Sequence, residues 1–246
     1  MKALQGLYEL VRETYGPLFP SSKAKKEAFL EKARNKMAHY KPKMEEICKV
    51  DMGEVHVKDF KYWVGDFMRD RLQEEYREYT KREGHEPSKF TKGVISSPIF
   101  TARAIVEPIV WLFMSSWGGI EMKHYNSSIY VPFYFQNRFM DMDFKRREKR
   151  LDQVIVHELS HRLWYALDGE ESSGRNWRLW NEGFAGYCAD NHFADLYPES
   201  FEVEQTKGFG VHARGKEKVE ELVEKYGTQI LLEVPKRWGE FANNSS

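Results

Sequence analysis

The chain has 246 residues, and its 38 lysines and arginines are matched by 38 aspartates and glutamates, so its formal net charge at pH 7 is zero. Proteins that bind nucleic acids or anionic membranes depend on an excess of positive charge, and this balance argues against both kinds of partner. Aromatic residues make up 15% of the chain and apolar residues 41%, a composition that excludes a wholly disordered protein.

The cysteines and the apolar stretches indicate the cellular compartment of the protein. Its two cysteines, Cys48 and Cys188, are too few for a disulfide framework or for a four-cysteine zinc site. The most apolar stretch, residues 105–114, contains Glu107 and Pro108 and is far shorter than the ~20 residues that cross a bilayer. The first residues lack the apolar core of a signal peptide. We therefore expect a soluble, cytoplasmic protein with no role at a membrane.

Residues 1–88 are predicted to form a helical N-terminal region, and residues 89–246 a separate domain that carries the chemistry. Within the N-terminal region a short amphipathic helix covers residues 2–15. A second helix follows, which Pro42 should stop or kink, because a proline inside a helix removes a backbone hydrogen bond. The apolar residues of this second helix recur every three or four positions: Phe29, Ala33, Met37 and Tyr40.

A longer helix is predicted to run from about residue 60 to Gly84, since glycine commonly ends a helix. Apolar side chains line one side of it and charged side chains the other. We expect this stripe to be buried against the rest of the protein, with a ligand-stacking face as the less favoured interpretation. The stripe consists of Phe60, Trp63, Val64, Phe67, Met68, Leu72, Tyr76 and Tyr79.

Residues 120–125 and 129–135 are rich in β-branched and aromatic residues, and they flank an Asn-Ser-Ser turn. This pattern predicts a β-hairpin. The second strand contains Pro132, which cannot donate a hydrogen bond to a neighbouring strand, so we expect this strand at the edge of a small mixed sheet. Residues 100–117 could form either a buried helix or a buried strand.

Residues 145–150 form the densest basic run of the chain, Lys-Arg-Arg-Glu-Lys-Arg. Because the chain has no net charge, we interpret this run as a solvated approach to the next helix rather than as a phosphate-binding patch. The run leads directly into the segment that carries the strongest motif.

The strongest motif is His157-Glu158-Leu-Ser-His161, on a helix predicted over residues 151–167 and ended by Asp168-Gly169. Residues four apart lie on one face of a helix, so the two imidazole rings can bind the same metal ion. Glu158 lies about 100° further around the axis, where its carboxylate can contact a molecule bound to the metal. The opposite side should anchor the helix in the core through Ile155, Leu159, Leu163, Ala166 and Leu167.

Glu182 is predicted to be the third metal ligand, because a zinc ion that activates water needs three protein ligands and one open position. It lies on a second helix, predicted over residues 180–195. The twenty residues between His161 and Glu182 are enough to lay this helix beside the first. Gly183 and Gly186 lower the helix propensity but would let two backbones approach each other closely.

Other nearby residues compete with Glu182 as the third ligand. His192, on the same predicted helix, is the less favoured alternative. Glu170 and Glu171 lie so close to the end of the first helix that they would have to fold back under strain.

The HExxH motif at residues 157–161, followed by Trp-Asn-Glu-Gly-Phe-Ala at residues 180–185, resembles the gluzincin group of zinc metallopeptidases. This group includes thermolysin, the aminopeptidase N type and the small minigluzincins. The resemblance covers about residues 155–190, and residues 129–135 fit more loosely as the edge strand that pairs with an extended substrate in the family.

The resemblance implies an α+β, zincin-like catalytic domain with an active-site helix and a glutamate helix. It implies that His157, His161 and Glu182 bind one Zn2+ per chain and that Glu158 activates the zinc-bound water. The reaction class is then hydrolysis of amide bonds in a peptide or an unfolded protein.

The chain also departs from the family pattern. It lacks the Gly-x-Met-Glu-Asn signature of the exopeptidases, so we expect an endopeptidase, and Arg162 is charged where relatives usually have an uncharged residue. A thermolysin-like carboxylate four residues beyond the distal glutamate is replaced by Gly186, for which Asp190 is a weak substitute. Larger relatives stabilise the oxyanion with a downstream Tyr or His. His212 is the candidate for this catalytic role here, although a solvated loop histidine is the favoured interpretation of this residue.

Two other functions remain open on the sequence. The first is a catalytically silent, zinc-stabilised module in which the N-terminal helices bind a protein partner. The second is a regulatory protease with a dedicated protein substrate, for which the basic run at residues 145–150 would be the docking surface. A role in nucleic-acid binding is not expected, and the sequence does not indicate the oligomeric state.

Overall fold

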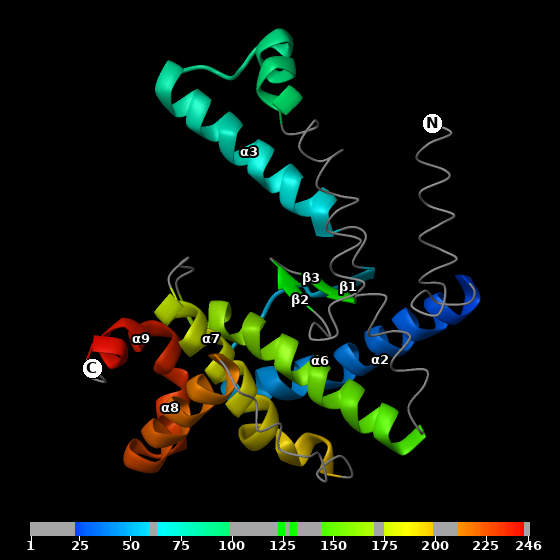
Figure 1. Ribbon diagram of the computed structural model, residues 1–246, viewed down its shortest axis with the longest axis vertical. Helices are drawn as coiled ribbons and strands as arrows, with labels where there is room; N and C mark the ends of the chain where they lie inside the picture. The colour runs from blue at the N-terminus through cyan, green and yellow to red at the C-terminus, as the bar shows by residue number, and fades with distance from the viewer. Residues whose placement is uncertain are drawn as a thin grey trace.

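The computed structural model describes residues 23–59, 63–98, 123–125, 128–131, 144–169, 175–198 and 211–243, and these form a mostly helical α+β arrangement with one small sheet (Figure 1). The predicted helix at residues 2–15 and the ambiguous segment at residues 100–117 lie outside these ranges. The elements follow one another as α2 (Lys23–Cys48), β1 (His56–Asp59), α3 (Trp63–Glu83), β2 (Lys123–Tyr125), β3 (Ser128–Val131), α6 (Phe144–Ala166), α7 (Arg175–Tyr187), the π-helical turn η3 (Cys188–His192), the 3-10 turn η4 (Ala194–Leu196), α8 (Val211–Tyr226), the 3-10 helix η6 (Thr228–Leu232) and α9 (Val234–Asn243).

The sheet has three strands in the order β1-β3-β2. β2 pairs antiparallel with β3, with His124 opposite Ile129, which confirms the predicted hairpin. β1 pairs with the other side of β3 in parallel, with Val57 opposite Ile129. The prediction that β3 is an edge strand is therefore wrong: β3 is the central strand, and all four of its residues are buried. Its paired residues end at Val131, one residue before Pro132, so the proline takes no place in the described ladder.

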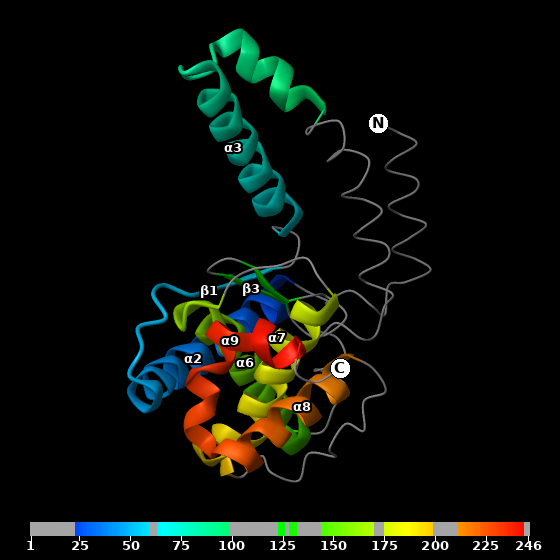
Figure 2. The same cartoon turned by 90° about the vertical axis from the view of Figure 1, so that its left-hand side faces the viewer.

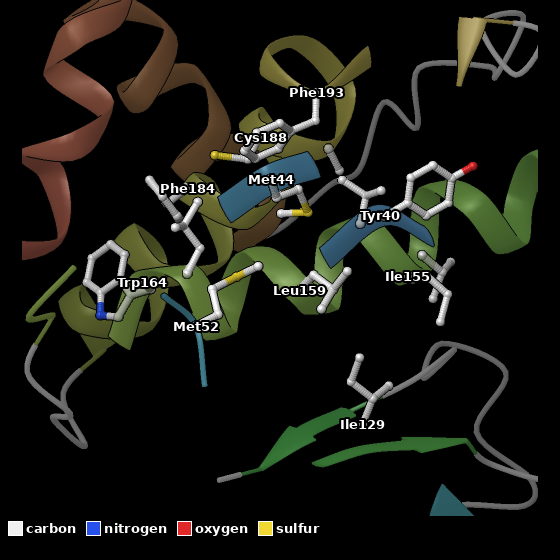
Figure 3. Close-up of a cluster of buried hydrophobic side chains, with 14 of the residues drawn as sticks. Tyr40, Met44, Met52, Ile129, Ile155, Leu159, Trp164, Phe184, Cys188 and Phe193 are labelled. Atoms are coloured by element: carbon white, nitrogen blue, oxygen red, sulfur yellow. The ribbon is translucent and has the colours of Figure 1, made fainter. Parts of the chain in front are cut away.

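α2 packs along α6 and supplies much of the core. Its predicted apolar side is confirmed, because Phe29, Ala33 and Tyr40 are buried and Met37 packs partly against them. The helix does not stop at Pro42 but continues for another turn and a half to Cys48. Met44 is fully buried in this extension (Figure 3), and its packing offsets the backbone hydrogen bond that the proline removes. Elements from both sides of residue 88 thus share one sheet and one core.

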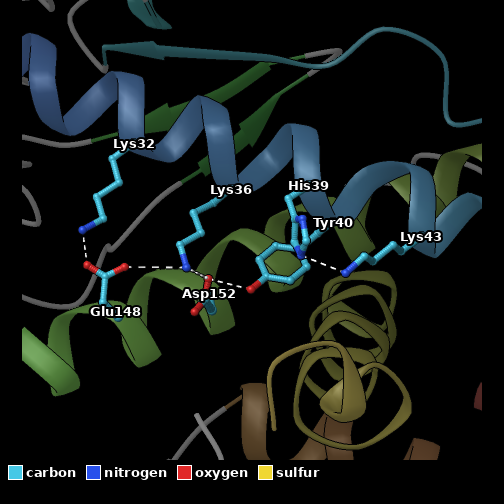
Figure 4. A network of polar contacts seen from close by, with 7 residues as sticks. All are labelled: Lys32, Lys36, His39, Tyr40, Lys43, Glu148 and Asp152. Atoms are coloured by element: carbon cyan, nitrogen blue, oxygen red, sulfur yellow. Dashed lines mark hydrogen bonds and ion pairs between the residues drawn. The ribbon is translucent and has the colours of Figure 1, made fainter. Parts of the chain in front are cut away.

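α6 begins at Phe144, seven residues before the predicted start, so the basic run forms its first turns and is not an approach segment. Glu148, inside this run, forms ion pairs with Lys32 and Lys36 of α2 (Figure 4). One turn further on, Asp152 is buried; it forms an ion pair with Lys36 Nζ and accepts a hydrogen bond from Tyr40 Oη, both at 2.7 Å. The N-terminal half of the helix that carries the histidines is therefore held by α2.

The end of α6 matches the prediction. Asp168 adopts the left-handed conformation, with φ of 60°, and the amide of Gly169 donates to the carbonyl of Trp164 at 3.0 Å. A Cβ at Gly169 would lie 2.3 Å from Trp164 Nε1, so only glycine fits there. The apolar side of α6 is buried as expected at Ile155, Leu159, Leu163 and Leu167, with Ala166 partly buried.

α3 and the helical residues 89–98 that follow it extend away from the other described elements (Figure 2). Gly84 ends α3 as predicted, with φ of 75° and its amide bonded to the carbonyl of Thr80. The expected burial is only partial where the stripe is described, because Leu72, Tyr76 and Tyr79 are each half-buried. Across the described residues, no helix is long and apolar enough to cross a membrane.

α7 and α8 cross at two glycines. α7 begins at Arg175 and ends at Tyr187, where the π turn η3 takes over, so the predicted continuous helix over residues 180–195 is only partly right. A Cβ at Gly183 would lie 2.2 Å from the carbonyl carbon of Gly215 on α8. The predicted close approach is therefore confirmed for Gly183. It is wrong for Gly186, whose Cβ would meet nothing within 4 Å in the described chain.

We expect Gly183→Ala to destabilise the protein and Gly186→Ala to leave it as stable or slightly more stable. The methyl group at residue 183 must push α8 away from α7, which should cost about 1–3 kcal/mol in the free energy of unfolding. The methyl group at residue 186 enters open space and raises the helix propensity, which should add about 0.4–1 kcal/mol. Urea unfolding of the two variants measures the difference, and equal stabilities would contradict the glycine crossing.

Candidate metal centre

The two motif histidines lie one turn apart on α6, as their spacing predicts. The ring centroids of His157 and His161 are 4.9 Å apart, and the ring planes are nearly perpendicular. The buried apolar residues of the opposite side fix the rotation of the helix, so both rings face α7. His161 is the more buried of the two, with 10% of its side chain exposed against 22% for His157.

α7 brings Glu182 to both histidines. Its Oε2 atom lies 3.6 Å from Nε2 of His157 and 3.4 Å from Nε2 of His161. The three potential ligand atoms all lie within 4.8 Å of one another, and in the described part of the chain this is the group that could hold a metal ion. α7 is anchored beside Glu182 by Trp180 and Phe184, both buried. The three residues predicted as metal ligands are therefore brought together.

The cluster holds the carboxylate of Glu182 in a mostly buried position. Burial alone would raise the pKa of Glu182, but the hydrogen bonds and charges of His157 and His161 hold it well below its usual range. Burial alone would lower the pKa of His161, but Glu182, with smaller contributions from Glu158 and Asn181, raises it. Two imidazole nitrogens and one carboxylate are thus held together, and this donor set suits zinc.

Two buried polar residues lie beside the ligands. Glu158 is 5% exposed, and its charge acts on His161, so its carboxylate is close to the cluster, as predicted. Asn181 is also 5% exposed and forms a side-chain hydrogen bond that favours the charged form of His161. A contact of this kind orients the ring of a metal-binding histidine. Sequence reasoning missed Asn181, although its position next to Glu182 was a signal.

His212 reaches the same carboxylate from a third helix. It lies in the first turn of α8, and its Nδ1 atom is 3.2 Å from Oε2 of Glu182. The side chain is 62% exposed, and its ring centroid is 6.1 Å from that of His157. Burial, opposed by Glu182 and aided by His157, His161 and Arg178, lowers its pKa. The expected loop is wrong, because the residue belongs to α8 and lies beside Glu182, whereas its large exposed fraction agrees with a solvated side chain.

The remaining candidates lie elsewhere. His192 packs edge-on against Phe193 and is not part of the metal-binding group, so the alternative third ligand is wrong. Asp190 accepts hydrogen bonds from Gln153 Nε2 at 2.7 Å and from Lys216 Nζ at 2.8 Å. It therefore joins α6, η3 and α8. Glu170 and Glu171 lie outside the described residues.

The unusual Arg162 has a structural contact. Its Nε atom donates to the carbonyl of Met52 at 2.6 Å, and Met52 is fully buried. The arginine that follows the second histidine thus ties α6 to the segment that leads into β1.

Comparisons with protein-family models, with curated proteins and with solved structures found no match for this chain. The interpretation of the site therefore depends on its own residues and geometry.

We expect the protein to bind one zinc ion per chain and His161→Ala to lose it. Removal of one of three ligands should abolish the increase in unfolding free energy that zinc gives, which would be about 4 kcal/mol at a thousandfold excess over Kd. Elemental analysis after gel filtration and thermal unfolding with and without zinc measure both effects.

His192→Ala is the matched control, because this histidine lies outside the cluster, and it should bind zinc like the unmodified chain. Equal zinc affinity in the His161→Ala variant would show that the ion binds elsewhere.

Proposed function

We propose that this protein is a zinc-dependent peptidase of the gluzincin type, built on a zincin-like domain. The observation that carries this proposal is the position of Glu182 Oε2, within 3.6 Å of the Nε2 atoms of both motif histidines. The sequence resemblance predicted this set of ligands, and the residues converge from two successive helices, α6, which ends at Ala166, and α7, which begins at Arg175.

Glu158 would be the proton acceptor of the reaction. His157, His161 and Glu182 would hold a zinc ion, which would supply Lewis acidity toward a water molecule and the carbonyl of the scissile peptide bond. The carboxylate of Glu158, buried beside the ligands, would take the proton of the attacking water and pass it to the leaving amine. Attack forms a C–O bond, and collapse breaks the C–N bond, so one water is consumed per peptide bond.

The substrate strand would pair with β2 rather than with β3. Both edges of β3 are occupied by β1 and β2, so it cannot pair with a peptide as the sequence suggested. Among the described residues, β2 is an outer strand of the sheet, and it contacts α6. An extended peptide added to an exposed strand gains backbone hydrogen bonds. A substrate bound along its whole length in this way fits an endopeptidase acting on peptides or unfolded proteins.

His212 would stabilise the oxygen that becomes negative during the attack. It is largely exposed and lies 3.2 Å from the carboxylate of Glu182, so it faces the side of the cluster that a substrate would approach. A neutral imidazole N–H can donate a hydrogen bond to such an oxygen.

A second function, a catalytically silent zinc-stabilised module, is favoured by one observation. Structural zinc sites have four protein ligands, whereas catalytic sites leave one position open. His212 is a fourth potential ligand beside the cluster, and a site that it closed permanently would be structural.

We expect Glu158→Gln to retain zinc and to lose peptidase activity. The amide has the shape of the carboxylate but cannot accept the proton, so turnover should fall by about 10²–10⁴-fold. Digestion of a mixed library of unfolded peptides, followed by mass spectrometry, measures turnover, and elemental analysis measures the metal.

Glu217→Gln, an exposed carboxylate on α8, is the control and should cleave at the rate of the unmodified protein. Cleavage that is insensitive to chelators, or that survives Glu158→Gln unchanged, would argue against the proposed mechanism. Tight zinc binding without any cleavage would favour the silent module.

A further inference from the structure

The Oε2 atom of Glu182 faces three imidazole nitrogens at nearly equal distances. These are Nε2 of His157 at 3.6 Å, Nε2 of His161 at 3.4 Å and Nδ1 of His212 at 3.2 Å. In a tetrahedral zinc site with bonds of ~2.0–2.2 Å, two ligand atoms are about 3.4 Å apart. The distance of His212 Nδ1 from Glu182 Oε2 therefore suits a shared ion, but the nitrogens of His212 do not lie within 4.8 Å of all three other ligand atoms, so the ring must turn before it can bind.

The backbone that carries His212 is firmly held. Three residues further along α8, Gly215 packs on α7, where a Cβ would lie 2.1 Å from the carbonyl oxygen of Leu179. One turn after His212, Lys216 forms the 2.8 Å ion pair with Asp190. Because α8 is fixed at both of these places, the Cα atom of His212 stays beside the metal centre.

The side chain of His212 is much less restrained than its backbone. It is 62% exposed, against 22% for His157 and 10% for His161. In the conformation described, it is too far from at least one other ligand atom to belong to the group that lies within 4.8 Å. A ligand that is close, but not locked by packing, can bind an ion and leave it again.

We propose that His212 is a displaceable fourth protein ligand, which closes the metal centre in the resting protein and is replaced by the substrate. The inference rests on the proposed function, since it concerns the same ion. The closed state has the four protein ligands of a structural site, and displacement of His212 converts it into a three-ligand site that admits water and a peptide carbonyl. The released side chain then lies where the proposed function needs a hydrogen-bond donor.

Cobalt(II) provides a test that does not depend on activity, because its visible absorption reports the ligands and geometry of the ion. The unmodified protein and the His192→Ala control should give the same spectrum when loaded with Co2+. His212→Ala should give a different spectrum, because solvent replaces an imidazole. Free imidazole added to His212→Ala should restore the spectrum of the unmodified protein, and zinc affinity should fall about 10–100-fold in this variant.

Displacement is tested with a peptide hydroxamate, a zinc-binding group carried on an extended peptide. Its addition should bring the unmodified protein and His212→Ala to the same final spectrum. A spectrum that changes with His212→Ala but does not respond to the hydroxamate would make His212 a permanent ligand, and this overturns the proposal of a displaceable one.

The outcomes separate this inference from the proposed function. If Co2+ and Zn2+ bind but the spectrum and the affinity are the same with and without His212, the fourth ligand is refuted and the peptidase proposal stands. If neither metal binds at the cluster, the proposed function itself fails. His212→Gln is measured in parallel, and circular dichroism verifies that both variants keep their helices, as the exposure of this side chain predicts.

Discussion

The pairing of the Glu182 carboxylate with the imidazoles of His157 and His161 is the contact on which the rest of this site depends. Each of these groups is at least three-quarters buried, and polar groups removed from water cost free energy unless they are paired. The three side chains satisfy one another across two helices. The cluster therefore forms only when α7 lies at one position along the axis of α6. Much of the surrounding packing holds α7 in that position.

The contacts that fix the relative position of α6 and α7 come from distant parts of the chain. α2 holds the first half of α6 through Glu148 and Asp152 (Figure 4), and Arg162 holds its second half to the carbonyl of Met52. On the other side, Asp190 links α6 to α8 through Gln153 and Lys216. α2 thus supports the candidate metal centre, because it shares both the core and the ion pairs of the helix that carries His157 and His161.

The sequence patterns predicted the features that depend on a single segment of the chain. They did not predict which segments pair with each other. The histidine spacing, the buried side of α6 and the Gly84 terminator each follow from the geometry of a single helix. The position of β3 was wrong because its second neighbour, β1, precedes α3 in sequence and gives no local sign of the pairing. Gly183 and Gly186 were both predicted to allow a close approach of two backbones. Of these two, only Gly183 faces another described backbone. The glycines around His212 favoured a loop in the sequence. In the structure, Gly215 instead allows α8 to pack closely on α7.

The choice between a structural and a catalytic zinc site turns on Glu158. A structural site is complete with four ligands, and a carboxylate one residue after the first ligand contributes nothing to such a site. Glu158 is nevertheless 5% exposed, and burying a carboxylate costs free energy in any fold. The proposed peptidase reaction uses a proton acceptor at this position, whereas the alternative of a silent zinc module gives Glu158 no role.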